Sequence, residues 1–379
     1  MKLAIISGTT LPGGGPRHIY NLLEKMDRRI WDIIVCTRKD GSYWDKLIAL
    51  GIAPYDLVLR RLSVFTFFEL FKILKKEKPD LIHTHGKGPG VYGRLLGWIL
   101  RIPVVHTFHG FQYNLLPVSI KLFYLCVENI LTLLTRHHIF VSKGEKGKAK
   151  ILRFLNDSNS SVINNGIDLD FLENLVPADD AFTSLGLRDS EKTKVFGTLS
   201  RVSPEKGITT LLEGFDEAKK IAPHIRLIIV GDCPDEHQEY IKTVRQYIHE
   251  NGLDRVVKIL GSREDALGLL KCVDFYVSSS MSEGLPYNIL ESLAVGNLVV
   301  ATDIPGNNDI IRKSVEGVLI PVNSPKSLAH GLLTVLEMGA EECKAMVQNG
   351  KARIRDQFSL SQMADKTFSL YKKVLDENS

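Results

Sequence analysis

The stretch of sequence that best indicates the fold runs from Phe275 to Ser292 and reads FYVSSSMSEGLPYNILES. Its first four residues form a short apolar run typical of a buried strand, and the apolar spacing after Pro286 predicts a helix. The sequence Gly-Leu-Pro at residues 284–286 interrupts any helix, so Glu283 stays on the loop, whereas Glu291 falls on the helix. The two carboxylates can therefore hold different parts of one ligand, and the helix N-terminus offers free N–H groups to a phosphate.

The same alternation of apolar runs and helical spacing continues along almost the whole chain, and it predicts parallel sheets covered by helices. Six strands are expected in each half: Leu3–Ser7, Asp32–Thr37, Leu81–His83, Val104–Thr107, His138–Val141 and Ser161–Ile163, then Lys194–Leu199, Arg226–Gly231, Val256–Leu260, Phe275–Ser278, Leu298–Ala301 and Gly317–Ile320. A chain of 379 residues is too long for one ordinary core. We therefore predict two doubly wound α/β domains joined near the turn residues 164–168, with the site in the cleft between them.

Composition narrows the class of protein. Hydrophobic residues make up 44% of the chain and charged residues 24%, which excludes a disordered or collagen-like protein.

The five cysteines form no C-x-x-C pair, so we expect neither a disulfide framework nor a zinc knuckle, and a reducing cytoplasm fits best. Residues 1–7 lead straight into a strand-like run, so no signal peptide is expected. The apolar segment Asn114–Thr135 is interrupted by Pro117 and Lys121 and is not expected to span a membrane.

Three glycines, Gly13, Gly14 and Gly15, follow the first predicted strand and precede helical spacing that starts at Ile19. Glycines at such a junction let a phosphate or a sugar approach the N–H groups of a helix N-terminus. The G-x-G-x-x-G pattern cannot be fitted here and an acidic ribose partner is not evident, which weakens a nicotinamide interpretation. A flexible turn is the alternative.

Histidines gather at two predicted strand ends, in HTHG at residues 83–86 and in HTFHG at residues 106–110. The end of a strand places polar side chains at the ligand-binding edge of the sheet. A zinc site is the rival interpretation, but the chain has no helical H-E-x-x-H and no cysteine beside these histidines. We expect no metal, and we expect His137 and His138 to be structural.

The segment SRVSPEKG, residues 200–207, follows the predicted strand Lys194–Leu199. It places the Arg201 guanidinium and the Lys206 ammonium five residues apart on a tight loop, before a helix that begins near Ile208. Two fixed cations beside a helix N-terminus suit a diphosphate. A pair of solvated surface side chains is the alternative.

Glu283 and Glu291 are separated by seven residues and form an E-x7-E segment. This segment, preceded by the glycine-rich turn and then the Arg201/Lys206 loop, resembles the family-4 retaining glycosyltransferases of the GT-B fold. The resemblance is to the type that builds bacterial surface polysaccharides. The resemblance covers nearly the whole chain, including PDLIHTH at residues 79–85, NGID at residues 165–168 and the terminal helical stretch 358–375. It implies an acceptor-binding Rossmann-like domain at 1–168 and a nucleotide-sugar-binding one at 169–357. It also implies a helix at 358–379 that crosses back to the N-terminal domain.

The resemblance further implies roles for individual residues. Arg201 and Lys206 would neutralise the leaving diphosphate, Glu283 would hold a sugar hydroxyl, and His109 would lie beside the transferred sugar. The implied donor contacts are Glu291 to the ribose, Arg263 near the base, backbone N–H groups around Gly284 and Leu285, and Gly14 and Gly15 near the diphosphate. The segment 232–235 departs from the family pattern, in which a glycine often follows the acid, and this leaves the shape of that loop open.

The implied reaction is transfer with retention, from a UDP-sugar to a lipid-linked or saccharide acceptor, without a metal or another cofactor. Glu283 as a covalent nucleophile is the rival mechanism, by comparison with retaining glycosidases. Two other functions stay open: a nucleotide-sugar epimerase of the same architecture and a non-catalytic module that binds sugar nucleotides. No nucleic-acid partner is expected.

The N-terminal half carries features that suit a membrane-bound acceptor. Residues 1–170 have 24 basic and 14 acidic side chains, a net charge of +10, against −6 for the remainder. Aromatic residues precede a lysine cluster, as at an anionic membrane surface: Phe65, Phe67, Phe68 and Phe71, then Lys72, Lys75, Lys76 and Lys78. The segment 111–134 adds Phe111, Tyr113, Leu115, Leu116, Phe123 and Tyr124. The alternative is that these aromatic side chains are buried in a helix that packs on the sheet. Our hypothesis is a cytoplasmic enzyme that lies at the inner face of the cell membrane and extends a lipid-linked saccharide.

Overall fold

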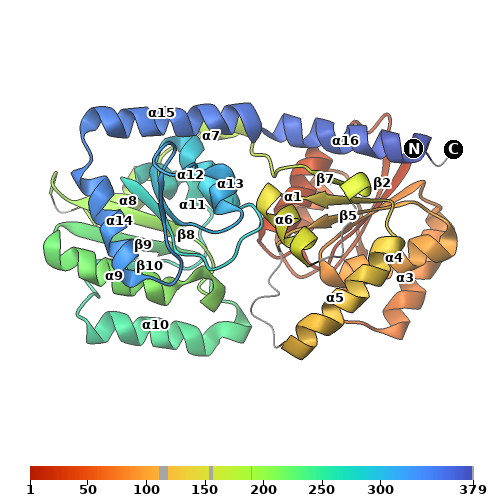
Figure 1. The fold of residues 1–379 in the computed structure, drawn as a ribbon, viewed down its shortest axis with the longest axis horizontal. Coiled ribbons are helices and arrows are strands. Elements are labelled where there is room, and N and C mark those ends of the chain that lie inside the picture. Colours follow the sequence, from red (N-terminus) through yellow and green to blue (C-terminus); the bar gives the residue numbers. More distant parts are fainter. Residues whose placement is uncertain (111–117, 153–156, 189, 378–379) are drawn as a thin grey trace. The chain divides into compact units, whose positions relative to one another are not determined.

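The computed structural model describes residues 1–110, 118–152, 157–188 and 190–377, and the chain divides into two compact units. Unit 1 comprises Met1–Gly166 together with Ser359–Ser379, and unit 2 comprises Ile167–Phe358. Each unit contains a parallel sheet with helices on both faces (Figure 1), which confirms the predicted α/β class. Among the described residues, no helix combines the length and the apolar character needed to cross a membrane.

The described part of unit 1 contains a seven-stranded sheet with the order β3-β2-β1-β4-β5-β6-β7. Its strands are β1 (Lys2–Ile6), β2 (Asp32–Thr37), β3 (Tyr55–Asp56), β4 (Leu81–His85), β5 (Val104–Phe108), β6 (His137–Phe140) and β7 (Ser160–Val162). Its helices are α1 (Gly14–Glu24), α2 (Tyr43–Ala49), α3 (Val64–Glu77), α4 (Lys87–Leu100), α5 (Val118–Leu133), α6 (Lys143–Ile151) and α16 (Leu360–Asp376), with a short 3₁₀ turn η2 (Asp157–Asn159).

The sheet of unit 1 has a hydrophobic core on each face, because successive side chains of a strand point to opposite sides. Leu3 and Ile5 of β1 pack with α1, α2 and α16, whereas Ala4 and Ile6 pack with α3 and α4. The C-terminal helix α16 therefore belongs to unit 1, although it is far from β1 in sequence. Tyr371 of α16 anchors it further by a hydrogen bond to Nδ1 of His83.

The described part of unit 2 contains a six-stranded sheet with the order β10-β9-β8-β11-β12-β13. Its strands are β8 (Lys194–Leu199), β9 (Ile225–Val230), β10 (Val257–Ile259), β11 (Phe275–Ser278), β12 (Leu298–Thr302) and β13 (Val318–Ile320). Its helices are α7 (Leu169–Glu173), α8 (Asp179–Ser184), α9 (Ile208–Ile221), α10 (Gln238–Glu250), α11 (Ala266–Cys272), α12 (Tyr287–Val295), α13 (Asn307–Ile310), α14 (Pro325–Glu337) and α15 (Ala340–Gln357), with 3₁₀ turns η3 (Pro204–Lys206) and η4 (Asp235–His237).

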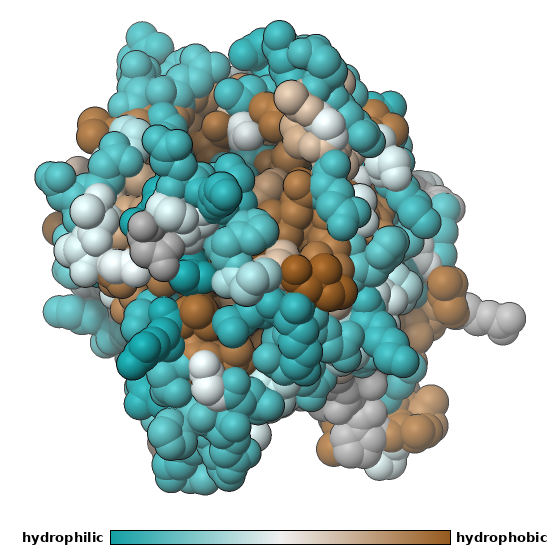
Figure 2. Space-filling view, turned by 90° about the vertical axis from the view of Figure 1, so that its left-hand side faces the viewer, coloured by the Kyte–Doolittle hydropathy of each residue, from teal (hydrophilic) through white to brown (hydrophobic). Residues whose placement is uncertain are grey.

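Most strand residues of unit 2 are buried, and on one face of the sheet side chains such as Leu227 and Val277 form a large core with α9, α10 and α14. The face turned to the viewer in Figure 2 is mostly hydrophilic, with apolar side chains near its centre and in smaller patches around it. At the centre of the sheet β8 pairs with β11. The loops that follow these two strands therefore leave the same edge of the sheet next to each other.

Candidate functional site

The loops after β8 and β11 are joined by hydrogen bonds to backbone carbonyl oxygens. The Oγ of Ser279 donates a hydrogen bond to the Lys206 carbonyl oxygen (2.8 Å), and the Met281 N–H donates to the Glu205 carbonyl oxygen (2.8 Å). Gly207 has a φ of +63°, and a Cβ there would lie 2.3 Å from the Ser279 carbonyl oxygen. Only glycine fits this position, because both the backbone conformation and the available space exclude a side chain.

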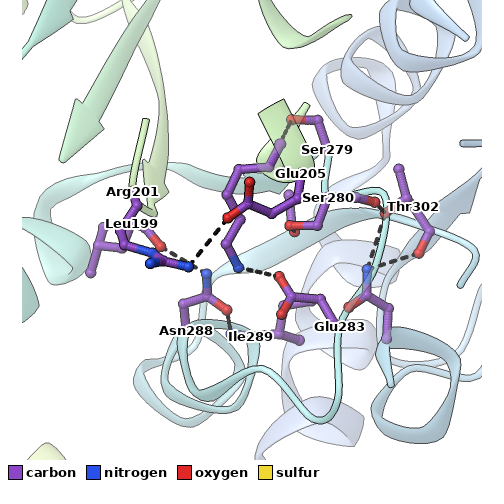
Figure 3. A network of polar contacts seen from close by, with 12 residues as sticks. Leu199, Arg201, Glu205, Ser279, Ser280, Glu283, Asn288, Ile289 and Thr302 are labelled. Atoms are coloured by element: carbon purple, nitrogen blue, oxygen red, sulfur yellow. Dashed lines mark hydrogen bonds and ion pairs between the residues drawn. The ribbon is translucent and has the colours of Figure 1, made fainter. Parts of the chain in front are cut away.

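These loops bring Arg201, Lys206 and Glu283 into one cluster of ion pairs. Lys206 Nζ lies 2.6 Å from Glu283 Oε1, and both side chains are mostly buried. Arg201 Nη2 lies 3.2 Å from Glu205 Oε1, and the arginine side chain is half exposed. Figure 3 labels Arg201, Glu205 and Glu283 and marks both ion pairs with dashed lines. Each cation thus already has a carboxylate partner, which the spacing of residues 200–207 did not predict.

Glu205 is held as a carboxylate by its surroundings. Burial favours a raised pKa for Glu205, but hydrogen bonds and the nearby Arg201 and Lys206 cations outweigh burial and lower its pKa. The cluster thus joins two basic and two acidic side chains by ion pairs. Such a cluster can bind an anionic ligand when phosphate oxygens add to, or replace, the carboxylate contacts.

The second glutamate, Glu291, lies on α12 and is buried. Burial, and to a smaller extent the carboxylates of Glu283 and Glu291, raise the pKa of the Tyr276 hydroxyl, so both glutamates lie near that group. Asn288 ties α12 to the end of β8, because its Nδ2 donates to the Leu199 carbonyl oxygen (2.7 Å; Figure 3). The helix that carries Glu291 is thus positioned by the strand that precedes Arg201.

The loop that contains Gly284 and Leu285 is supported from the neighbouring strand β12. Gly306 has a φ of +97°, and a Cβ there would lie 2.7 Å from the Gly284 carbonyl oxygen. Thr302 Oγ1 donates to the Ser280 carbonyl oxygen (2.6 Å), and Asn307 Nδ2 donates to the Thr302 carbonyl oxygen (2.9 Å). Sequence reasoning missed this support, although Thr302 is a polar residue at a strand end, the signal that pointed to the other loops.

Arg263 lies on the loop after β10 and forms two hydrogen bonds of 2.7 Å with the Asp265 carboxylate. The loop is connected to the Arg201 loop through Asp232. Asp232 Oδ1 accepts from the Ser262 N–H (2.8 Å), and the Asp232 carbonyl oxygen accepts from the Val202 N–H (2.9 Å). The segment whose shape the sequence left open thus joins the loops after β8, β9 and β10.

The remaining predicted residues lie in unit 1. Gly14 and Gly15 are the first residues of α1, and a Cβ on Gly15 would lie 3.9 Å from Cδ2 of His109. Burial, and to a smaller extent the His18 ring, hold the pKa of His109 well below its usual range, so its imidazole is neutral at pH 7. His85 Nδ1 lies 3.0 Å from His109 Nε2. His18 and His85 surround His109, and neither was predicted as a site residue.

Comparison with known proteins matches the two halves of the chain to two families of glycosyltransferases. Residues 186–353 match the family described as glycosyl transferases group 1, and residues 12–171 match Glycosyltransferase Family 4. The UDP-Gal:alpha-D-GlcNAc-diphosphoundecaprenol alpha-1,3-galactosyltransferase of Escherichia coli is 28% identical over 388 residues, which cover 98% of this chain and 96% of the relative. The alpha-monoglucosyldiacylglycerol synthase of Streptococcus pneumoniae is 29% identical over 84% of this chain and 75% of its own.

Solved structures also resemble this chain. HepE from Anabaena, solved in complex with UDP and glucose, matches with a TM-score of 0.86 and 22% sequence identity. The match covers 98% of this chain and 100% of HepE. At this identity the likeness establishes the fold alone.

Proposed function

This chain is a glycosyltransferase of family 4 with the GT-B fold, and we propose that it transfers a hexosyl or N-acetylhexosaminyl group from a UDP-sugar to a lipid-linked or saccharide acceptor, with retention of configuration. The observation that carries this proposal is the cluster of two cations and two carboxylates after β8 and β11. A ligand that combines a diphosphate with sugar hydroxyls matches both kinds of charge.

Arg201 and Lys206 bind and neutralise the leaving diphosphate in this proposal. Lys206 donates to Glu283 with one of its three N–H groups, which leaves donors for phosphate oxygens while the carboxylate holds the side chain in place. Two fixed cations supply the charge stabilisation for which other enzymes use a divalent ion. We therefore propose transfer without a metal.

The other predicted residues bind the rest of the donor. Glu291 accepts hydrogen bonds from the ribose hydroxyls, and Arg263 lies near the base. Glu283 and His109 hold the transferred sugar. Backbone N–H groups of Gly284 and Leu285 bind sugar and phosphate oxygens, and Gly14 and Gly15 let the diphosphate approach the start of α1. The family resemblance and the tied loops of unit 2 support these assignments.

Retention is proposed to occur without a covalent intermediate. Glu283 is the rival nucleophile, but its Oε1 already accepts a hydrogen bond of 2.6 Å from the Lys206 ammonium, so that oxygen is engaged. We propose an oxocarbenium-like transition state in which the departing diphosphate accepts the proton of the acceptor hydroxyl. The leaving group then stays bound to Arg201 and Lys206 while the new bond forms on the same face of the sugar.

A lipid-linked acceptor is supported by the relatives and by the surface of unit 1. The names of both reported relatives contain a lipid-linked sugar, a GlcNAc-diphosphoundecaprenol in one and a monoglucosyldiacylglycerol in the other. In unit 1, α3 exposes Phe65 (89%) and Phe68 (57%) and then Lys72, Lys75 and Lys76, and Lys78 is exposed just after the helix. Apolar side chains followed by lysines suit the interface of an anionic membrane. We propose a peripheral enzyme of surface-polysaccharide synthesis at the inner face of the membrane.

Helix α5 supports the same assignment. Its buried side chains within the described range are Glu128 and Leu131, whereas its exposed apolar side chains include Leu122, Phe123 and Leu133. A helix so apolar on its outer surface is typical of a contact with lipid or with a lipid-linked ligand. Of the aromatic residues predicted beside it, Phe111 and Tyr113 lie outside the described residues, as do Leu115 and Leu116.

A screen of nucleotide-sugars for slow hydrolysis tests the donor assignment. The purified chain is incubated with UDP-, GDP-, ADP- and TDP-sugars in chelator, and free nucleoside diphosphate is measured. We expect one UDP-hexose or UDP-N-acetylhexosamine to be hydrolysed, and the anomeric configuration of the transferred sugar, read by NMR, to equal that of the donor. Preference for another base, or inversion, would contradict the proposal.

A further inference from the structure

Three histidine side chains converge in unit 1 at the carboxyl ends of adjacent strands. His85 ends β4, His109 follows β5, and His18 lies on α1, which follows β1. The sheet order β1-β4-β5 places these positions side by side. One ring nitrogen of each residue lies within 4.8 Å of the corresponding nitrogens of the other two. His18 and His85 are buried, and His109 is partly exposed.

Two of these rings have a buried nitrogen that makes no hydrogen bond. His18 Nδ1 lies 3.1 Å from Asn165 Oδ1, and because an amide oxygen only accepts, the His18 proton is assigned to Nδ1. His18 Nε2 is then a bare lone pair in the protein interior, and it has no hydrogen-bond partner within the described ranges. His85 Nε2 likewise has no hydrogen-bond partner there, whereas His85 Nδ1 faces His109 Nε2. Buried polar atoms without partners are rare and call for a ligand or another explanation.

The neighbouring His83 has no such unpartnered nitrogen, although it also lies near the end of a strand. His83 Nδ1 bonds to the Tyr371 hydroxyl, and its Nε2 lies 2.7 Å from Thr107 Oγ1. Both of its nitrogens are satisfied although its ring centroid is only 4.0 Å from that of His85. His83 therefore has a structural role. Within the cluster, His18 and His85 each have one buried nitrogen without a partner among the described residues; His138 on β6, which lies outside the cluster, has two.

We propose that His18, His85 and His109 form a binding site for one transition-metal ion of the zinc class. Zinc takes imidazole nitrogens at about 2.0–2.1 Å, which sets neighbouring ligand nitrogens roughly 3.4 Å apart in a tetrahedron. His85 Nδ1 and His109 Nε2 are already 3.0 Å apart, so their hydrogen bond opens and the rings turn when the ion enters. A set of imidazoles without a carboxylate favours Zn²⁺ or Co²⁺ over Mg²⁺ or Ca²⁺.

The surroundings prepare the three imidazoles as ligands. The Asn165 side chain fixes the His18 ring in the same way that carbonyl groups orient metal-bound histidines. Burial lowers the pKa of all three rings, to about 4 for His18, so each presents an uncharged nitrogen at neutral pH.

One consequence rests on the proposed function. If His109 holds the transferred sugar, a metal ion on its ring withdraws it from the donor, so zinc inhibits a transferase that needs no metal for transfer. The binding of the ion itself does not depend on that role.

The test is calorimetry of the full-length, untagged, chelator-treated chain with ZnCl₂ alone, together with the visible absorption of its Co²⁺ form. We expect one tight site, loss of at least about tenfold in affinity for H18N and for H85N, and a loss of about 10–100-fold for N165A. The matched control is H249A, since that side chain is 84% exposed and lies in unit 2, and it should bind as the parent does. Circular dichroism confirms that each variant is folded.

The site is disproved if the parent binds no zinc with 1:1 stoichiometry, or if H18N and H85N bind it as tightly as the parent does. Because no nucleotide-sugar is present in this experiment, its result is independent of whether the chain turns over a donor. A separate assay of UDP release with added zinc then tests inhibition, which should disappear in H18N if the ion acts through this site.

Discussion

At the scale of single residues, the contact between Lys206 and Glu283 governs the chemistry of the candidate site. An ammonium paired with a largely buried carboxylate stays in one place, and its remaining N–H groups are aimed before any ligand arrives. The types of Arg201, Lys206 and Glu283 and their positions on loops were predictable from the sequence. Their pairing was not, because residues 206 and 283 are brought together only by the adjacency of β8 and β11.

Removing either cation should lower turnover by about 10²–10³-fold, since each stabilises charge that develops on the leaving diphosphate. The variants are R201A and K206A, measured as UDP release with saturating acceptor. K220A is the control, because Lys220 forms a surface ion pair with Asp216, and its turnover should match that of the parent. Near-normal rates in R201A or K206A, or strict dependence on a divalent ion, would mean that the diphosphate is neutralised elsewhere.

The two glutamates should differ in which step they affect. E291A should weaken UDP binding, because ribose contacts exist in the ground state and in the transition state alike. E283A should bind UDP as well as the parent or better, since Lys206 loses its competing carboxylate, but its turnover should fall. Calorimetry with UDP and a turnover assay separate these effects. Equal losses of UDP affinity in both variants would refute the division of roles.

At the scale of elements, periodicity predicted twelve of the strands to within about two residues at either end, because buried parallel strands are continuous apolar runs. The two-residue edge strand β3 was missed, since Tyr55–Asp56 pairs through its backbone and carries no apolar run. The sequence also did not reveal which face of α3 is buried: Leu70 and Leu74 pack on the sheet, while Phe65 stays outside.

Helix α5 is held to α4 by a buried ion pair rather than by a broad apolar face. The Arg94 guanidinium makes hydrogen bonds of 2.8 and 3.1 Å with the Glu128 carboxylate, and the two side chains are 0% and 4% exposed. E128A should lower the free energy of unfolding by about 3–5 kcal/mol, because it leaves a buried guanidinium unpaired. Chemical denaturation of the full chain measures this change.

Two controls accompany that measurement. The double variant R94M/E128L should recover most of the lost stability, because it removes both buried charges and keeps apolar volume. D27A, which breaks the exposed pair between Asp27 and Arg29, should cost less than about 1 kcal/mol. A loss below 1 kcal/mol in E128A as well would show that the pair does not hold α5.

At the scale of the whole molecule, charge and exposed apolar surface are distributed unevenly. The basic excess lies in residues 1–170, and most of the exposed large apolar side chains lie in unit 1 as well. The charge asymmetry could be read from the sequence. The exposure of the apolar side chains could not be read from the sequence, because the spacing of the aromatic residues in 65–71 also fits a helix that buries them.

This distribution predicts binding to anionic vesicles. The parent chain should co-sediment with anionic vesicles at low salt and less at high salt, because surface charges are screened. F65S/F68S should lose most of this binding without loss of stability, since both side chains are exposed. I221S, which alters a 70% exposed side chain of unit 2, is the matched control and should bind like the parent. Indifference to lipid charge, with efficient transfer to a soluble sugar, would favour a soluble acceptor.

The central claim is that the chain transfers a sugar from a nucleotide donor, and the most direct test is the release of UDP in chelator, with and without acceptor. The donor is the UDP-sugar found by the hydrolysis screen, and the acceptor is a membrane lipid extract. We expect slow release alone, a large increase when the extract is added, and sugar label in the lipid fraction. Conversion of the sugar without UDP release would indicate an epimerase, and donor binding without release under either condition would indicate a binding module; either result would contradict the account.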